Sequence, residues 1–461
     1  MRRNGRNTGN RRSHSNSLLQ SIRHINKFKL LLIILIIFLI FLISFICVRS
    51  HFKSHSTDAF SAELADNSSD NAENTLSNNG SENSENNSNV ENNQNTENDE
   101  NQDSSDEEEV KGPTTFTLAA LGDVMCHNTQ YFDAYNSSTG EYDFSYVFDD
   151  IITETKIPNI TVANLETTFA GEDVGYSNYP TFNSPDSLAT ALRDIGVDVV
   201  STAGNHSLDK GFSGLSRTID VLNDNLIYPY GTSQTAEAQN KILYQYVKGV
   251  KIAFLSYTYG TNGIAIPSDK TYCVNLIDKD FIKSQIDIAK NQGADLIVTS
   301  MHWGTEYSKT PSDEQKNLAD FLFQNGVDII LGNHPHVLQP MEKRTVTLED
   351  GTQKDGFVVY SLGNFTADQT DVDTKTSIVL NLTITKAEDG KISIDDVSYT
   401  PIYMYKNSNA STHKFRLLNI RSAIENYESG IDTSIGKSTY NTLKTQLEKV
   451  NSMYQNVNYW F

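Results

Sequence analysis

Side chains that bind metals recur in short Gly- and Asn-rich motifs of this sequence, each after an apolar run. The candidate ligands are Asp123, Glu166, Asn205, His302, His334 and His336, with His127 as a further candidate. If the apolar runs are neighbouring strands of one α/β sheet, their ends can meet in a single crevice. Imidazole and carboxylate groups are common metal ligands. The pattern therefore predicts a metal centre built from distant parts of the chain.

Two metal ions would give these residues hydrolytic chemistry. Ions about 3.5–4 Å apart lower the pKa of bound water and stabilise both the attacking and the leaving oxygen. Glu166 is the candidate bridge, and Asp123 and His336 would hold the first ion. The second ion would be held by the remaining ligands, Asn205, His302 and His334. Nitrogen and oxygen donors of this kind suit Mn²⁺, iron or Zn²⁺.

His206 and Asp209 are the candidate catalytic residues. His206 would face the substrate and donate a proton to a phosphoryl oxygen or to the leaving group. Asp209 would orient the imidazole. Ordinary structural roles compete with these: Asp209 could cap a helix, and Asn205 suits a left-handed turn. A single loop histidine often has no ligand role, so it is the combination of motifs that favours a metal site.

The elements that must position these residues follow an α/β pattern from Thr114 onward. Strands are expected at 116–121, 160–163, 197–201, 296–300, 328–331 and 358–361. Helices are expected at 187–195, 213–225, 281–291 and 313–325. Residues 244–257 predict a hairpin, and 377–385 with 391–399 predict a second antiparallel pair. The tail from residue 411 predicts two helices that pack on the core.

The backbone at the motifs is expected to be unusual. Glycines 122, 204, 304 and 332 would let the chain turn sharply at the strand ends. The run His334-Pro335-His336 directly follows a buried strand, and we expect it to be a strained, pre-set pair.

The N-terminal quarter of the chain predicts an anchor and a tether. Residues 30–48 are apolar apart from Ser44, and nineteen residues at about 1.5 Å each reach roughly 28 Å, enough to cross a hydrocarbon core. Eight Lys and Arg in the basic segment 1–29 predict a cytoplasmic N-terminus and an extracellular body. A cleaved signal peptide is the alternative, but the apolar run is long and no Ala-x-Ala follows it. Residues 49–112, rich in Asn, Ser and acids, predict a disordered linker.

The charge of the body limits its partners. From Lys111 onward the chain has 27 Lys and Arg against 42 Asp and Glu, a net charge of −15. This excess argues against nucleic acid or anionic lipid as a partner, and it makes a polyanionic ligand awkward unless cations intervene. Outside the apolar run only Cys126 and Cys273 remain, and their spacing does not require a disulfide.

The ordered motifs resemble the poly-γ-glutamate capsule biosynthesis (CapA-type) proteins over about 114–365. The motifs that carry the resemblance are Gly122-Asp123-Val124-Met125, Asn164-Leu165-Glu166, Ala203-Gly204-Asn205-His206, His302-Trp303-Gly304, Gly332-Asn333-His334-Pro335-His336, Ser361-Leu362-Gly363-Asn364-Phe365 and Tyr179-Pro180-Thr181-Phe182-Asn183-Ser184-Pro185. That family in turn resembles calcineurin-like metallophosphoesterases. The resemblance implies a four-layer αββα sandwich over 113–405, with a helical tail over 406–461. It also implies an anchored component of capsule polymer synthesis and export.

Three positions depart from the metallophosphoesterase pattern. Met125 stands where those enzymes have the histidine of Asp-x-His, so one metal loses a ligand unless His127 replaces it. Glu166 stands where an Asp is usual, and Ser207 where an acid is usual. The departures predict one tightly bound metal and one weakly bound neighbour.

Four residues near the motifs are candidate substrate contacts: Asn183, Trp303, Glu306 and Asn364. Trp303 could line a groove, although core packing explains most aromatic residues. Glu306 could be a catalytic acid, a supporting residue or the cap of the following helix.

The preferred interpretation is a membrane-anchored extracellular metal-dependent phosphoesterase-like protein. It would act with an extracellular anionic polymer or its synthase complex. A non-catalytic assembly or polymer-binding subunit and a metal-dependent γ-glutamyl amide hydrolase are the alternatives.

Overall fold

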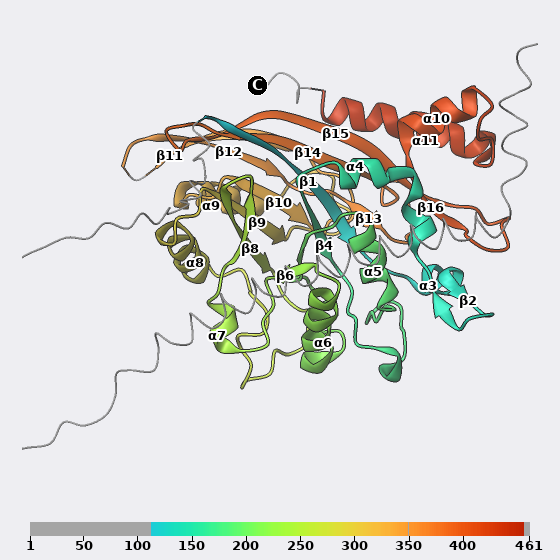
Figure 1. Cartoon of the computed structure of the whole chain (residues 1–461), viewed down its shortest axis with the longest axis horizontal. Coiled ribbons are helices and arrows are strands. Elements are labelled where there is room, and N and C mark those ends of the chain that lie inside the picture. The colour runs from blue at the N-terminus through green and yellow to red at the C-terminus, as the bar shows by residue number, and fades with distance from the viewer. Residues whose placement is uncertain (1–111, 349, 456–461) are drawn as a thin grey trace, which may run out of the picture. The chain divides into compact units, whose positions relative to one another are not determined.

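The computed structural model describes residues 112–348 and 350–455 of the chain (Figure 1). The predicted cytoplasmic segment 1–29, the predicted membrane helix 30–48 and nearly all of the predicted linker 49–112 lie outside the described residues. Within the described ranges, the model contains no helix with the length and apolar character of a membrane span.

A mixed eight-stranded sheet is built around β1 (Thr114–Val124). β1 pairs parallel with β4 (Ile160–Leu165) and antiparallel with β14 (Thr376–Lys386). The other strands are β5 (Val199–Ser201), β6 (Tyr228–Tyr230), β13 (Asn364–Thr366), β15 (Ile392–Lys406) and β16 (Phe415–Asn419). The order is β16-β15-β14-β1-β4-β5-β6, with β13 beside β1.

A second sheet has six strands in the order β11-β12-β10-β9-β8-β7. Its strands are β7 (Leu243–Val247), β8 (Val250–Thr258), β9 (Leu296–His302), β10 (Ile329–Asn333), β11 (Met341–Thr347) and β12 (Gln353–Val359). The four inner strands run parallel, and both edge strands are antiparallel. The β7–β8 hairpin confirms the predicted one, since Lys248 and Gly249 both adopt the positive φ of its tight turn.

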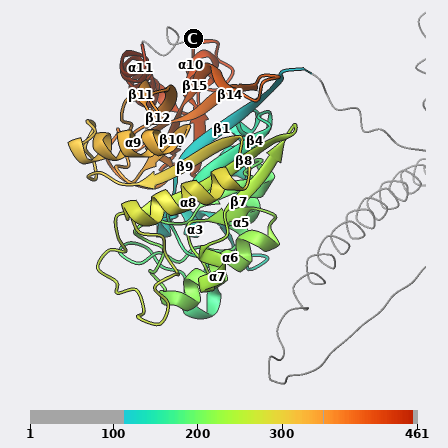
Figure 2. The same ribbon diagram turned by 90° about the vertical axis from the view of Figure 1, so that its left-hand side faces the viewer.

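Each sheet contributes buried side chains from both of its faces. On β1, Phe116, Leu118 and Ala120 contribute to a core shared with the second sheet, whereas Ala119 and Leu121 contribute to a core shared with helices. Those helices are α3 (Asn128–Ala134), α5 (Ser187–Asp194) and α6 (Gly211–Asp224). The second sheet is covered on its outer face by α8 (Lys279–Asn291) and α9 (Asp313–Asn325) (Figure 2). The predicted α/β class is confirmed, and helices flank both sheets.

The remaining elements are short or belong to the tail. Short elements are β2 (Tyr135–Asn136), β3 (Glu141–Tyr142), η2 (Ser145–Ile151), α4 (Ile152–Lys156), η3 (Glu172–Val174) and α7 (Ala236–Gln239). The tail contains the two predicted helices, α10 (Ile420–Glu428) and α11 (Gly436–Met453), beside β15 (Figure 1). Sequence periodicity missed β16, which joins the main sheet. Helix α10 begins only after it, where the side chain of Asn419 accepts from the N–H groups of Arg421 and Ser422.

Two of the predicted turn glycines are needed for close packing instead. Of glycines 122, 204, 304 and 332, only Gly304 has a positive φ, 88°. A Cβ on Gly122 would lie 1.9 Å from Gly363 O, and one on Gly332 would lie 2.0 Å from Tyr360 O. These glycines therefore let neighbouring backbone segments approach at the strand ends.

Replacing Gly332 with alanine is expected to destabilise the protein by about 3 kcal/mol, the upper range for overpacking. The added methyl group would clash with the Tyr360 carbonyl, which is backbone and cannot swing away. Gly260→Ala is the matched control, because its Cβ would meet nothing within 4 Å. Denaturant unfolding of both variants measures the difference, and equal midpoints would contradict the packing argument.

Candidate metal centre

The predicted ligands converge where strand ends of the two sheets meet. Asp123 lies at the end of β1, and Glu166 directly follows β4. His302 is the last residue of β9, and His334 directly follows β10. In the parallel register Asn333 pairs with His302, and Asp123 pairs with Asn164. The parallel strands of each sheet therefore bring these side chains to the same end. The crevice lies between two sheets, not along the single sheet that the strand pattern suggested.

Two overlapping ligand groups form there. Asp123, Glu166 and His336 offer ligand atoms that all lie within 4.8 Å of one another. Glu166, His302 and His334 form a second group with the same spacing. Glu166 belongs to both groups, which is the arrangement expected of a bridging carboxylate.

Distances within the centre are short. His336 Nδ1 lies 3.1 Å from Asp123 Oδ2 and 3.8 Å from Glu166 Oε2. His302 Nε2 lies 3.5 Å from Glu166 Oε1. The same nitrogen lies 2.9 Å from Asn205 Oδ1, so Asn205 joins the second group. Asn164 is a further residue of the centre that the sequence pattern did not predict; its amide donates to Asp123 Oδ1 at 2.9 Å.

The residues present fit a metal, as their unpaired atoms indicate. Both oxygens of the Glu166 carboxylate are buried without a hydrogen-bond partner, and so is His334 Nδ1. Leaving such a group unpaired costs about 1–3 kcal/mol, and more when it is charged. A divalent cation would satisfy the carboxylate and the imidazole together, because both are ligand types that such ions accept.

The electrostatics of Glu166, His302 and His334 agree with this fit. Burial raises the pKa of Glu166 to about 8, with the Asp123 charge adding to the rise. Burial lowers the pKa of His302 to about 3 and that of His334 to about 2, so both rings are neutral and keep a lone pair. Burial also opposes the charged form of His336, but Glu166 and Asp123 outweigh it and raise its pKa to about 9.

The predicted strain in the His334-Pro335-His336 run is confirmed. His334 has a φ of 97° and His336 a φ of 59°, values that non-glycine residues rarely adopt. Strain of this kind costs about 1–3 kcal/mol per residue. The backbone is held in place because His334 N donates to Asp123 Oδ2 at 3.3 Å and Tyr307 N donates to Pro335 O at 2.8 Å.

His206 and Asp209 form a buried pair beside the ligand groups. His206 Nδ1 donates to Asp209 Oδ2 at 2.7 Å, and the same oxygen accepts from Phe182 N at 2.6 Å. The Phe182 ring packs edge-on against His206 with centroids 4.8 Å apart. Burial disfavours the imidazolium, but the bond to Asp209 and the charge of Glu166 outweigh it and raise the pKa of His206. Asp209 therefore orients the imidazole so that its other nitrogen, Nε2, points away from the Asp209 carboxylate.

His127 is not arranged as a metal ligand, contrary to its candidacy. Its Nδ1 accepts the N–H of Asp368 at 3.1 Å. Burial lowers its pKa to about 4, so the ring is neutral and its proton lies on Nε2. A protonated nitrogen has no lone pair for a metal. At the position where the resemblance expects a histidine, Met125 is buried in an apolar cluster with Phe182 and Ala367.

Three of the four candidate substrate contacts have buried structural roles. Asn183 accepts from Ala170 N and donates to the carbonyls of Gly171 and Gly175. Trp303 is 2% exposed, and its indole N–H donates to Tyr360 O within the core. The burial of these side chains leaves them no surface for substrate.

Asn364 supports the centre, and Glu306 faces it. The Asn364 amide donates to Gln369 Oε1 and Thr374 O, while its Oδ1 lies 3.0 Å from His336 Nδ1. Glu306 is exposed, and its carboxylate forms a third possible ligand group with His334 and His336. Of the four candidates, Glu306 is the one open to a substrate.

Tyr259 and Asn262, in the loop after β8, also belong to the site, although the sequence analysis missed them. The Tyr259 ring lies 4.7 Å from that of His334, and Asn262 Nδ2 lies 3.4 Å from His206 Nε2. The signal was present: a strand-like run ends in Tyr259-Gly260-Thr261-Asn262-Gly263, like the other motifs. These residues follow the predicted hairpin 244–257, and they contain no histidine or carboxylate that would mark them as a metal-binding motif.

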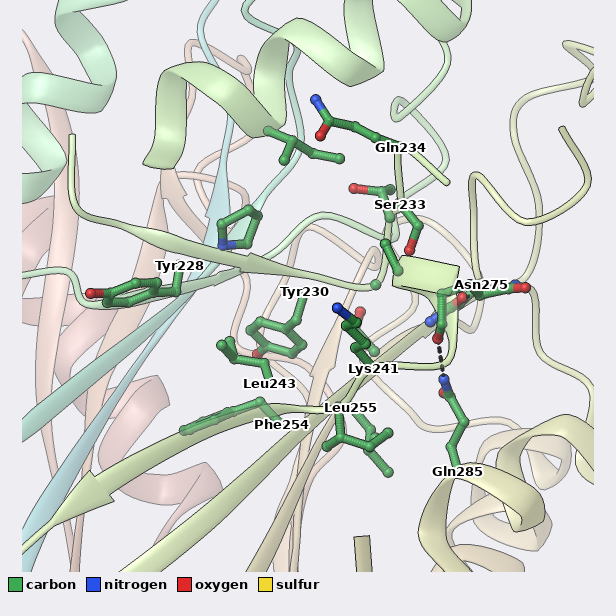
Figure 3. A pocket seen from close by; sticks show the side chains of 18 of the residues that line it. Tyr228, Tyr230, Ser233, Gln234, Lys241, Leu243, Phe254, Leu255, Asn275 and Gln285 are labelled. Carbon is green, nitrogen blue, oxygen red and sulfur yellow. Dashed lines mark hydrogen bonds between the residues drawn. The ribbon is translucent and has the colours of Figure 1, made fainter. Parts of the chain in front are cut away.

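Two cavities differ in their position relative to the metal centre: one lies beside it, and the other lies away from it. One of about 580 Å³ adjoins His336, since Tyr307 lines it and that ring lies 6.0 Å from the His336 ring. Another, of about 210 Å³, lies between β6 and β8 (Figure 3). Its lining includes none of the candidate ligands. Its amides bond within the protein, as in Gln239 to Asn275 and Gln285 to Gln239 O, so it lacks the unpaired groups of the metal centre.

Comparison with known proteins identifies relatives by sequence. The family described as bacterial capsule synthesis protein PGA_cap matches residues 117–369. The chain is 30% identical over 275 residues to the capsule biosynthesis protein CapA of Bacillus anthracis, covering 57% of this chain and 62% of that protein. It is 33% identical over 224 residues to the PGA biosynthesis protein CapA of Bacillus subtilis (strain 168), covering 48% and 55%. The match thus spans somewhat over half the length of these relatives.

Two solved structures are among those similar to this chain. The calcineurin-like phosphoesterase YfkN from Bacillus subtilis has a TM-score of 0.40 and 15% identity, covering 72% of this chain and 99% of that chain. The Haemophilus influenzae NAD nucleotidase (NadN) has a TM-score of 0.41 and 13% identity, covering 74% and 60%.

Loading the purified protein with Mn²⁺ is expected to give up to two bound ions per chain. Glu166→Gln should remove most of the metal, because this residue belongs to both ligand groups, and His336→Ala should remove only part of it. His127→Ala should leave the content unchanged. Elemental analysis after gel filtration measures all four proteins. A loss in His127→Ala as large as that in His336→Ala would refute the tautomer argument.

Proposed function

This chain belongs to the bacterial capsule synthesis protein (PGA_cap) family, and from that premise we propose that it is a membrane-anchored extracellular metal-dependent phosphoesterase-like protein of capsule polymer biosynthesis. Its relatives are named for capsule and PGA biosynthesis. The observation that carries the proposed chemistry is the buried, unpaired Glu166, shared by two ligand groups. Such a carboxylate between two sets of imidazoles suits a dinuclear hydrolytic centre.

In the proposed reaction the ligand residues would hold two divalent cations, which polarise a phosphoryl group and lower the pKa of the attacking water. His206 would present Nε2 toward the leaving oxygen, because its Nδ1 is engaged by Asp209. The bond from phosphorus to that oxygen breaks as water adds. The leaving oxygen takes a proton from His206. The attacking water releases one proton, and that proton restores the protonated His206 imidazole.

The proposed location rests on the N-terminal sequence. The apolar run at 30–48 would span the membrane once, with the basic segment 1–29 in the cytoplasm. The acidic linker would hold the body away from the membrane surface. The proposed partners are an extracellular anionic polymer or its synthase complex. Since the body is itself acidic, bound cations would have to mediate contact with a polyanion.

Met125 favours a second candidate function, a non-catalytic assembly subunit that keeps a metal for structure. Its thioether is buried against Phe182 and Ala367, so it adds no ligand beside Asp123. Metal content without turnover on any phosphodiester would support this alternative.

Glu306 favours a third candidate, hydrolysis of γ-glutamyl amide bonds. An exposed carboxylate facing His334 and His336 would repel the anionic phosphoryl group of a phosphodiester, but it could serve as the general base in attack on an amide carbonyl. Release of glutamate or shortened chains from poly-γ-glutamate would support this alternative.

His206→Ala is expected to lower kcat on an alkyl phosphodiester by about 100-fold or more, with metal content unchanged. The loss should be smaller on a 4-nitrophenyl diester, because that weakly basic leaving group needs little protonation. Asp209→Asn should give a smaller loss, since the ring keeps a partner. His413→Ala is the control, because this exposed histidine stacks on Tyr146 and belongs to none of the ligand groups. Equal losses on both diesters would place His206 at the phosphoryl oxygen instead.

Glu306→Gln separates the phosphoesterase from the amide hydrolase. If Glu306 is a general base, the variant should lose about 100-fold or more in release of glutamate from poly-γ-glutamate while keeping phosphodiester activity. If the phosphoesterase proposal holds, the variant should keep or raise that activity, because the repelling charge is gone. Steady-state rates on both substrates distinguish the two functions. If Glu306→Gln lost as much phosphodiester activity as His206→Ala, Glu306 would be neither the general base of an amide hydrolase nor a dispensable charge of a phosphoesterase.

A further inference from the structure

The loop after β8 forms a wall of the site beside His206. Asn262 Nδ2 lies 3.4 Å from His206 Nε2, the nitrogen that faces the leaving oxygen in the proposed reaction. The Tyr259 hydroxyl donates to Asn262 Oδ1 at 3.3 Å. A group that departs toward His206 therefore also meets the Asn262 amide and, behind it, the Tyr259 hydroxyl.

Tyr259 connects the loop after β8 to the candidate metal ligands His302 and His334. Its ring is stacked nearly parallel to that of His302, with centroids 6.3 Å apart, and lies 4.7 Å from that of His334. Its backbone N–H donates to His302 O at 3.1 Å. The ring is still 48% exposed, so one side faces solvent.

The loop keeps its shape through other side chains. Thr258 Oγ1 donates to Gly260 O at 3.1 Å, and Thr261 Oγ1 donates to Ile264 O at 2.7 Å. Asn262 is exposed and has a φ of 52°, a conformation that asparagine tolerates better than most residues. The 3.3 Å and 3.4 Å contacts of its amide are long, so a ligand that offers shorter bonds can replace them.

We propose that Asn262 and Tyr259 form the leaving-group subsite of this centre and select esters whose leaving alcohol carries neighbouring hydroxyl or amide groups. This inference rests on the proposed phosphoesterase function and deepens it by naming a substrate class. An amide offers two donors and an acceptor, and a phenol offers one donor and acceptor capacity. Both are uncharged, so they match neutral polyhydroxy or amide-bearing groups rather than charged ones. A site that hydrogen-bonds a substrate hydroxyl discriminates against the analogue that lacks it.

The test compares two diesters whose leaving alcohols share a three-carbon chain: one linked to glycerol, the other to propanol, whose alkoxide is the more basic leaving group. The Mn²⁺-loaded full-length protein should favour the glycerol diester in kcat/KM. Asn262→Gly removes the amide and suits the positive φ, and Tyr259→Phe keeps the stacked ring but removes the hydroxyl. Each change should lower kcat/KM for the glycerol diester by about fivefold to tenfold, the effect of a lost neutral hydrogen bond, and leave the propanol diester within about twofold.

Other outcomes would overturn the inference. Equal losses on both diesters would mean that the two residues only support the loop, and no change on either would mean that they do not meet the leaving group. Gly260→Ala, in the same loop but with open space around its added methyl, should leave both rates unchanged and so checks for loop disturbance. If the metal-loaded wild-type protein hydrolyses neither diester, the proposed function itself fails and takes this inference with it. That result differs from an active wild-type protein whose Asn262→Gly and Tyr259→Phe variants hydrolyse both diesters at unchanged rates, which overturns this inference alone.

Discussion

The buried carboxylate of Glu166 is the constraint on which the site depends. Its side chain is fully shielded from solvent, and neither oxygen has a hydrogen-bond partner in the described chain. A carboxylate in this position is unfavourable without a compensating cation, and its raised pKa reflects that cost. The surrounding imidazoles of His302 and His334 are held neutral by the same burial, so they supply lone pairs rather than charge. The centre is thus electrostatically incomplete in a way that a divalent cation completes.

Rigid packing holds this unfavourable arrangement in place. The strand ends that bear Asp123 and His334 are pressed against the turns at 360–363, and Gly122 and Gly332 allow this approach. Strained backbone at His334 and His336 persists because hydrogen bonds and packing over-determine it. The stability of the two-sheet core therefore offsets local strain at the site, as is common where groups must be set in position before a ligand arrives.

The sequence predicted those parts of the site that follow from parallel strands. Asp123 and Glu166 could be placed together because residues at the ends of neighbouring parallel strands share one edge. His302 lies at the end of a strand of the second sheet, and the packing of the two sheets brings it to the same site. Side-chain orientation was not predictable: Trp303 turns into the core, and the hydrogen bond from Asp368 fixes the tautomer of His127. Both depend on long-range contacts that no local pattern records. The neutral residues of the β8 loop were missed because amides and phenols carry no distinctive spacing.

The two candidate ion positions differ, and the difference bears on activity. Asn205 supplements Glu166, His302 and His334, whereas the position of Asp123 and His336 gains no ligand from Met125, which packs against carbon. Fewer protein ligands imply weaker binding of the ion there. They also leave coordination open to water or substrate, which is the property that separates catalytic from closed structural sites. The substitution of methionine for a ligand therefore lowers the expected affinity for one ion, but by itself it does not argue against catalysis. A lost ligand would indicate a purely structural role only if protein atoms closed the vacant coordination position. Glu306 is the carboxylate that could approach that position, and its side chain is exposed, so the position is open to solvent.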